Sequence, residues 1–166
     1  AQKRRSTLES RELRKELSDG SKIIKKLAGS SKIMLKLKED ILDYSQSNAF
    51  VLIEGETGSG KTLVAHALHA VSQNMSRTVI TVHCSAYDED TLSRKLFGPI
   101  QENDQFLPAF EEAKGGTLIL EDIETLTIEL QGKLLDKLVA LEHSLEIRLI
   151  TISNHPSSTF TKKILR

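Results

Sequence analysis

One short segment constrains the fold of this chain more than any other. Gly55-Glu-Thr-Gly-Ser-Gly-Lys-Thr62 follows the pattern G-x-x-x-x-G-K-[ST]. The apolar run at 49–54 predicts a buried strand before it, and residues 63–71 predict a helix after it. Glycines let the backbone wrap around an anion, and the start of a helix adds positive potential. This context favours a phosphate-binding loop over a chance glycine turn.

Every position of this segment, called the 55–62 loop below, has a predicted role. Its backbone N–H groups are expected to point inward at phosphate. Lys61 is expected to reach the outer phosphates, and the Thr62 hydroxyl is expected to ligate Mg²⁺. The predicted phosphate-binding residues are Gly55, Glu56, Thr57, Gly58, Ser59, Gly60, Lys61 and Thr62.

Length, charge and cysteine content exclude several classes of protein. The 166 residues suit one domain of ordinary size. Lys plus Arg and Asp plus Glu each number 23, and a zero net charge argues against a domain that mainly binds a nucleic-acid backbone. The single cysteine, Cys84, excludes an internal disulfide and fits a reducing compartment. Without a membrane-spanning run or a signal peptide, we expect a soluble, cytoplasmic domain that does not contact membranes.

Apolar and β-branched runs alternate with helical patterns along the chain. This alternation predicts an α/β fold, with a parallel sheet covered by helices on both faces. Predicted strands are 49–54, 78–83, 117–120 and 147–152; predicted helices are 33–44 after a serine N-cap, 63–71, 90–97 and 128–143, with a helical turn at 110–113.

The first residues differ in character from the rest. Residues 1–27 are highly charged, and Leu13, Leu17, Ile24 and Leu27 form a weak heptad. This pattern is compatible with a helix that pairs with a partner, and equally with a solvated helix or linker. We therefore divide the chain into a charged helical linker at 1–27 and a nucleotide-binding core at 28–166.

Polar residues follow the third and fourth predicted strands. Glu121 and Asp122 end the third strand, and Asn154 follows the fourth. Ligands bind at the carboxyl ends of parallel strands, so these residues should converge with the 55–62 loop. One carboxylate of such a pair holds Mg²⁺, and the second orients or deprotonates the attacking water. Asn154 could bond a terminal phosphate or that water; an ordinary loop cap is the alternative.

Other reactive side chains form no recognisable site. His66 and His69 lie on the helix after the loop without an evident third metal ligand, so core or surface histidines are expected. Cys84 has no obvious base partner, which favours a buried small hydrophobic residue.

Several sequence blocks, in order, resemble the AAA+ domain of NtrC-type bacterial enhancer-binding proteins. The similarity runs from about Leu27 to Asn154. The matching blocks are 28–31 with Met34, 51–61, 63–65 with Leu68 and His69, 84–86, 96–98, 110–118 and 130–135.

The family consists of ATPases that assemble as rings and remodel sigma-54 RNA polymerase. Many members are response regulators, with a receiver domain before this module and a DNA-binding domain after it. The resemblance implies ATP or ADP and Mg²⁺ as ligands, self-association as a dimer or ring, contact with RNA polymerase, and DNA binding through a domain outside this chain. It also likens residues 3–16 to the family's linker helix and places Asn154 on the sensor I position.

Departures from the family pattern qualify these expectations. The family contacts sigma-54 through a GAFTGA loop, but residues 99–109 lack that motif and form a shorter segment. The acidic pair is reversed: Glu121 can still approach Mg²⁺, whereas Asp122 is one methylene short for the catalytic role. A misplacement of about 1 Å can cost on the order of a hundredfold in rate. His83 replaces an asparagine that restrains the family's catalytic glutamate.

The family's fifth strand, arginine finger and helical lid are expected beyond Arg166, so we expect a fragment or a truncated relative. We predict an Mg-ATP-binding core of an NtrC-like transcriptional regulator, slow or inactive as an ATPase in isolation and without the usual sigma-54 contact. The alternative is a degenerate AAA+ platform that dimerises or docks a partner without turnover. A small-molecule kinase would need arginines in a lid, for which the sequence offers only scattered candidates such as Arg94 and Arg148.

Overall fold

A parallel sheet organises the computed structural model, which describes residues 24–25, 27–72, 78–99, 107–141 and 147–156. Its strands follow the order β1-β4-β3-β2, so each connection from one strand to the next has to cross over the sheet. The strands are β1 (Val51–Glu54), β2 (Val79–His83), β3 (Thr117–Glu121) and β4 (Arg148–Ser153). All pairs are parallel, which confirms the predicted sheet. The heptad positions Leu13 and Leu17 lie outside the described residues.

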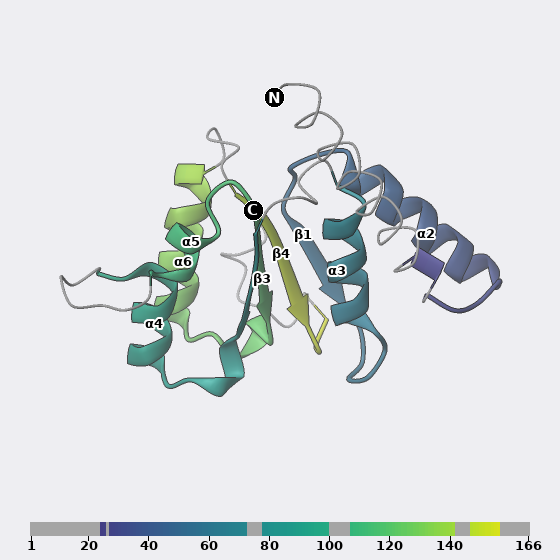
Figure 1. Ribbon diagram of the computed structural model, residues 1–166. Coiled ribbons are helices and arrows are strands. Elements are labelled where there is room, and N and C mark those ends of the chain that lie inside the picture. Colours follow the sequence, from purple (N-terminus) through teal and green to yellow (C-terminus); the bar gives the residue numbers. More distant parts are fainter. Residues whose placement is uncertain (1–23, 26, 73–77, 100–106, 142–146, 157–166) are drawn as a thin grey trace, which may run out of the picture.

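Helices cover both faces of this sheet (Figure 1). On one face lie α2 (Lys32–Ser45) and α3 (Lys61–Ala70). On the other lie α4 (Glu89–Phe97), α5 (Ala109–Glu112) and α6 (Ile128–Leu141). Ser31 caps α2 as predicted, since its Oγ accepts the Met34 N–H at 3.3 Å. Across the described residues, no helix is both long enough and apolar enough to span a membrane.

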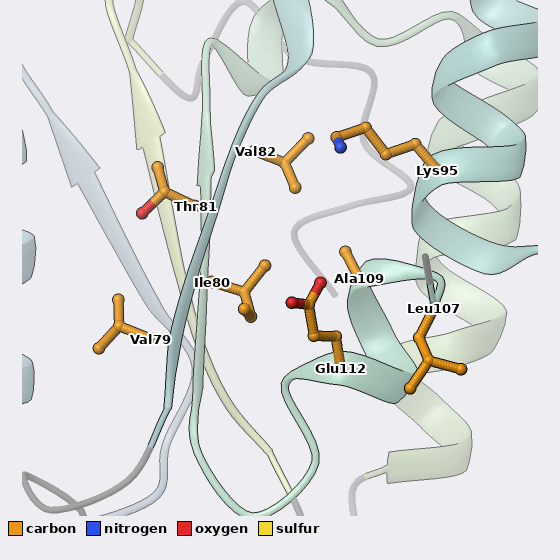
Figure 2. Close-up of a pocket in the computed structure, with 8 residues that line it drawn as sticks. All are labelled: Val79, Ile80, Thr81, Val82, Lys95, Leu107, Ala109 and Glu112. Atoms are coloured by element: carbon orange, nitrogen blue, oxygen red, sulfur yellow. The ribbon is translucent and has the colours of Figure 1, made fainter. Parts of the chain in front are cut away.

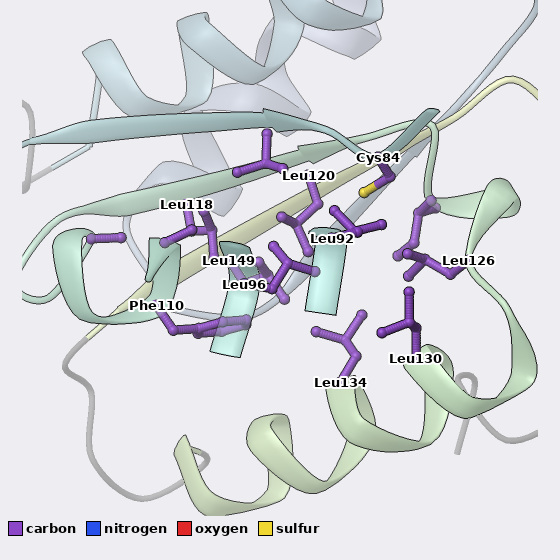
Figure 3. Packing of buried hydrophobic residues seen from close by; sticks show 14 of the residues in the cluster. Cys84, Leu92, Leu96, Phe110, Leu118, Leu120, Leu126, Leu130, Leu134 and Leu149 are labelled. Atoms are coloured by element: carbon purple, nitrogen blue, oxygen red, sulfur yellow. The ribbon is translucent and has the colours of Figure 1, made fainter. Parts of the chain in front are cut away.

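Alternating side chains of the central strands fill two separate cores. Leu118 and Leu120 of β3 pack with α4, α5 and α6, together with Phe110 and Leu134 (Figure 3). Ile119, between them, faces the other core with α2 and α3. Burial on both faces explains why β3 reads as a continuous apolar run rather than an alternating one.

Two contacts fix the strands relative to their surroundings. At Gly116, just before β3, an added Cβ would lie 2.1 Å from the Thr78 carbonyl oxygen, so only glycine fits between the strands. Arg148, at the start of β4, is 1% exposed and donates from Nη2 to Tyr44 O at 2.7 Å and from Nη1 to Ser45 O at 3.3 Å. Burial lowers the pKa of this guanidinium. Arg148 therefore ties β4 to the last turn of α2 and is buried too deeply to serve in a lid.

Candidate functional site

The 55–62 loop connects β1 to α3, as predicted. Gly58 and Gly60 have φ values of 80° and 90°, a conformation that strongly favours glycine. Gly55 has no positive φ, and an added Cβ would approach only a side-chain atom closely, Ser59 Oγ at 2.9 Å. Special backbone angles are therefore required at Gly58 and Gly60 but not at Gly55.

Lys61 lies across the loop. Its side chain is largely buried, with 8% exposure, and its Nζ donates to the Glu56 carbonyl at 2.6 Å. The Ser59 N–H donates to the same carbonyl at 3.1 Å. Glu56 O is thus a common acceptor that closes the loop, whose last two residues, Lys61 and Thr62, are the first two residues of α3.

The loop and the end of β3 meet through Thr62 and Glu121. Thr62 Oγ1 donates to Glu121 Oε1 at 3.1 Å, although the two residues are 59 positions apart. Mg²⁺ prefers oxygen ligands and is commonly held by one or two protein oxygens together with substrate phosphates and water. This hydroxyl–carboxylate pair fits such an ion. Among the residues that the structure describes, no cluster of three or more His, Cys, Asp or Glu forms an independent metal site.

Asp122 is the second residue of the acidic turn, a name we use for residues 121–125. Its backbone is left-handed, with φ of 57°. Ser85 Oγ donates to Asp122 Oδ2 at 2.5 Å, and Asn154 Nδ2 donates to Oδ1 at 2.8 Å. The Asp122 carbonyl accepts from Thr125 N and Oγ1, at 3.0 and 2.8 Å. Both carboxylate oxygens and the backbone of Asp122 are therefore held in place.

His83 contacts the first acid of the pair. Its Nδ1 lies 3.2 Å from Glu121 Oε2, on the carboxylate that also accepts from Thr62. By resemblance, His83 stands where the family has an asparagine that restrains the second acid. Here that second acid, Asp122, is bonded by Ser85 instead. Ser85 lies just past the end of β2, so the rule that ligands gather at strand ends could have identified it.

Asn154 joins the acidic turn, as its position after β4 predicted. Its side chain bonds Asp122 and also Glu124, whose Oε1 accepts from Asn154 Nδ2 at 3.1 Å and from its backbone N–H at 3.2 Å. The neighbouring Ser153 carbonyl accepts the Gly55 N–H at 3.3 Å, which places Asn154 beside the start of the loop. Sequence reasoning missed Glu124, although a third acid two positions after the pair was a visible signal.

The remaining reactive side chains belong to the core. Burial is the main cause that raises the pKa of the Cys84 thiol to about 12, with further contributions from Asp122 and Glu124. This thiol is 2% exposed, and the interpretation of Cys84 as a buried small hydrophobic residue is confirmed. His69 is buried too, with Nδ1 2.9 Å from Thr117 Oγ1.

A separate cavity of about 250 Å³ lies along β2 (Figure 2). Ile80 and Val82 form part of its wall, and Lys95 of α4 and Glu112 of α5 project toward it. None of its lining residues belongs to the 55–62 loop or to the acidic turn. This cavity is therefore distinct from the candidate site.

Comparison with known families decides the assignment. The family described as the Sigma-54 interaction domain matches residues 27–146. The chain belongs to this family.

Two curated proteins illustrate the similarity. The chain is 37% identical over 139 residues to the C4-dicarboxylate transport transcriptional regulatory protein DctD of Pseudomonas aeruginosa, and the match covers 80% of this chain and 30% of DctD. It is 40% identical over 116 residues to the transcriptional regulatory protein ZraR of Salmonella typhimurium, covering 66% of this chain and 26% of ZraR. The chain thus spans less than a third of either protein.

Solved structures show the same fold. NtrX from Brucella abortus, in complex with ATP, is similar with a TM-score of 0.73 and 29% identity, over 95% of this chain and 40% of NtrX. The P-loop NTPase domain of a sigma-54 transport activator from E. coli has a TM-score of 0.60 and 24% identity, over 82% of this chain and 89% of that domain, and it shows the fold. The predicted α/β fold of the P-loop NTPase (AAA+) type and the predicted family are both confirmed.

Proposed function

We propose that this Sigma-54 interaction domain binds Mg-ATP at the 55–62 loop. The observation that carries the proposal is the convergence of Thr62 and Glu121, at 3.1 Å, beside a glycine loop with Lys61 across it. A neighbour, NtrX, has been crystallised with ATP and with ADP. In the bound domain, the N–H groups of residues 55–60 contact phosphate and Lys61 contacts the outer phosphates.

Mg²⁺, when bound, neutralises charge on the phosphates. Thr62 and Glu121 are its protein ligands in this proposal, and Asp122 and Asn154 stand in the catalytic positions. The Thr62 hydroxyl already faces the Glu121 carboxylate, so little rearrangement of these two side chains is required.

Hydrolysis by this domain is weak in our proposal. Asp122 is shorter than the glutamate of the family pattern, and both of its oxygens accept hydrogen bonds, from Ser85 and Asn154. A general base has to come within hydrogen-bond reach of the water that it activates, in the orientation that proton transfer needs. The clamped, short carboxylate meets this requirement poorly.

The finer assignment concerns the whole protein. We propose a cytoplasmic NtrC-like transcriptional regulator, of the response-regulator type, in which residues 1–27 form a linker and residues 28–166 belong to the nucleotide-binding core. It self-associates as a dimer or ring and binds DNA through another domain. Residues 99–109 lack the GAFTGA motif, which supports a regulator without the usual sigma-54 contact, although contact with RNA polymerase by another route remains part of the proposal.

A second candidate function is an interaction platform that dimerises or docks a partner without ATP turnover. The clamped state of Asp122 favours it, because a site that only holds nucleotide, or none, has no need of a free base.

Calorimetry with ATP and Mg²⁺ tests the proposal. We expect binding by the folded domain and its loss in Lys61→Ala, with Lys133→Ala, a surface lysine paired with Glu129, as the matched control. A folded protein that binds no ATP would contradict Mg-ATP binding. Turnover at rates ordinary for the family would contradict weak hydrolysis. An unchanged regulatory output of Lys61→Ala in the full-length protein would favour the platform.

A further inference from the structure

Both amide protons of the Asn154 side chain are used by carboxylates. Nδ2 donates to Asp122 Oδ1 at 2.8 Å and to Glu124 Oε1 at 3.1 Å. Ionised carboxylates only accept hydrogen bonds, so the NH₂ end of the amide has to face them. The end that remains is Oδ1, which is an acceptor. Phosphate oxygens are acceptors as well, so Asn154 held in this way has no proton to donate to a terminal phosphate.

Glu124 is the part of this network that fixes the amide. Its Oε1 accepts from the backbone N–H of Asn154 at 3.2 Å as well as from Nδ2, so the carboxylate is anchored to the main chain of β4's end. The turn that carries Glu124 is closed by the bonds from Thr125 to the Asp122 carbonyl. Both sides of the contact are therefore held by backbone hydrogen bonds.

The second oxygen of Glu124 takes no part in the contact with Asn154. Oε2 is buried and has no hydrogen-bond partner within the described part of the chain. A buried polar atom without a partner destabilises the folded state, and such atoms are few in native proteins.

Asn154 lies where the orientation of its amide would matter. The residue before it, Ser153, accepts the N–H of Gly55, the first residue of the loop. On the other side, Asn154 contacts Asp122 and Glu124 of the acidic turn. The amide thus stands between the phosphate-binding loop and the acids.

We propose that Glu124 is a positioning residue that holds the Asn154 amide on the acidic turn and away from the terminal phosphate of the nucleotide. Asn154 then offers only Oδ1, which suits a water molecule and not a phosphate oxygen. As a consequence, Asn154 does not help the domain to distinguish ATP from ADP unless the contact with Glu124 is broken. This inference rests on the proposed binding of Mg-ATP.

A double-mutant cycle on nucleotide affinity tests the inference. The probes are the non-hydrolysable analogue AMP-PNP and ADP, each with Mg²⁺, measured by calorimetry on the whole chain. Glu124→Ala frees one Nδ2 proton, while the other still bonds Asp122, and is expected to raise the ratio of AMP-PNP to ADP affinity about tenfold, the size of one hydrogen bond to a charged group. Asn154→Ala alone should leave this ratio unchanged, and the double variant should lose the gain.

Glu124→Gln is the matched control for the cycle. Its Oε1 is held by the Asn154 backbone N–H and can still accept both bonds, so the affinity ratio should stay within about twofold of the parent value, a difference well below one hydrogen bond. An unchanged ratio in Glu124→Ala would overturn the inference. A tenfold fall of the AMP-PNP to ADP affinity ratio in Asn154→Ala alone would also overturn it, because such a fall indicates a direct contact between Asn154 and the terminal phosphate.

A measurement without nucleotide separates this inference from the proposed function. In protein labelled with ¹⁵N-asparagine, the Asn154 side-chain signals are assigned by their loss in Asn154→Ser. Their hydrogen exchange should be slow in the parent and in Glu124→Gln, and about tenfold faster in Glu124→Ala, because one hydrogen bond is lost. Equal exchange in all three proteins would overturn the role of Glu124. If the protein shows slow exchange but binds no nucleotide, the proposed function is contradicted, whereas the positioning of Asn154 by Glu124 is still supported.

Discussion

The 55–62 loop and the acidic turn lie at the same ends of the strands, yet they are held by contacts of different range. Within the loop, Lys61 and Ser59 both bond the carbonyl of Glu56, five and three residues away. In the acidic turn, Asp122 bonds Ser85, and Glu124 bonds Asn154, across 37 and 30 residues. The loop is therefore shaped mainly by its own residues, with the Thr62–Glu121 and Gly55–Ser153 bonds as its links to β3 and β4, while the turn depends on the strands beside it.

The strand order explains this difference. β3, which carries the acidic turn, lies between β2 and β4. Ser85 follows β2 and Asn154 follows β4, so the turn receives a hydrogen bond from each side. The loop follows β1, which in the described sheet has β4 as its single neighbour. A change in the sheet should consequently affect the turn first, and a change inside the loop should reach the turn only through the Thr62–Glu121 bond.

Gly116→Ala should have the largest effect on the sheet. The new Cβ would meet the Thr78 carbonyl oxygen at 2.1 Å and force β2 and β3 apart. We expect the free energy of unfolding to fall by about 3 kcal/mol, the upper end for overpacking. Urea denaturation measures it. In Gly132→Ala, the control within α6, the added Cβ meets no atom within 4 Å, and stability should rise by about 0.5–1 kcal/mol. Similar effects at both glycines would refute the close strand approach.

Gly60→Ala tests whether the loop is an independent local structure. An added Cβ meets no atom within 4 Å, so the penalty comes from the φ of 90° alone. We expect a loss of about 1–2 kcal/mol in unfolding free energy. NMR shift changes should be confined to the loop and the first turn of α3.

Gly60→Asn provides the control for this loop variant. Asparagine adopts the left-handed conformation more readily than alanine, so its loss should be smaller. Shift changes that spread through β3 beyond Glu121, which Thr62 contacts directly, would show that the loop and the turn are coupled through the sheet.

Ser85→Ala should have a smaller effect, limited to the acidic turn. It removes the donor to Asp122 Oδ2 and should lower the free energy of unfolding by about 1.5 kcal/mol, as for a hydrogen bond to a charged group. Ser93→Ala is the control: this hydroxyl accepts from Lys133 on the exposed surface, at 3.3 Å, and its loss should be close to neutral. Equal stability of the two variants would contradict the cross-strand support of the turn.

Cys84, beneath the acidic turn, should give the smallest effect, and only in alkali. The unfolded thiol titrates near its ordinary pKa of 9.0, whereas the native thiol keeps its proton to about 12. This contribution to stability is complete below pH 9 and is lost as the pH rises toward 12. At pH 10, the stability advantage of the parent over Cys84→Ala should be about 1 kcal/mol smaller than at pH 7.5. Parallel urea-denaturation profiles of the two proteins over this range would contradict the raised pKa.

Local patterns predicted the elements well because their causes are local. The 117–120 run predicted β3, leucines at helical spacing predicted α6, and a serine before an amphipathic segment predicted the cap of α2. The convergence of Thr62, Glu121 and Asn154 followed from one rule about strand ends. This rule does not predict which individual side-chain atoms form hydrogen bonds with one another. Ser85 and Glu124 were therefore missed, and His83 was linked to the second acid although it contacts Glu121.

By itself, the sequence determined that this chain has a glycine loop between a strand and a helix, a parallel α/β sheet and an acidic pair at the end of a buried strand. These features depend on backbone preference and hydrophobic periodicity, which act between near neighbours. Only the tertiary structure decided that Asp122 is clamped by Ser85 and Asn154, and that Glu124 turns the Asn154 amide toward the acids. Those contacts join side chains that follow the ends of three strands, and their partners are set by strand order and register.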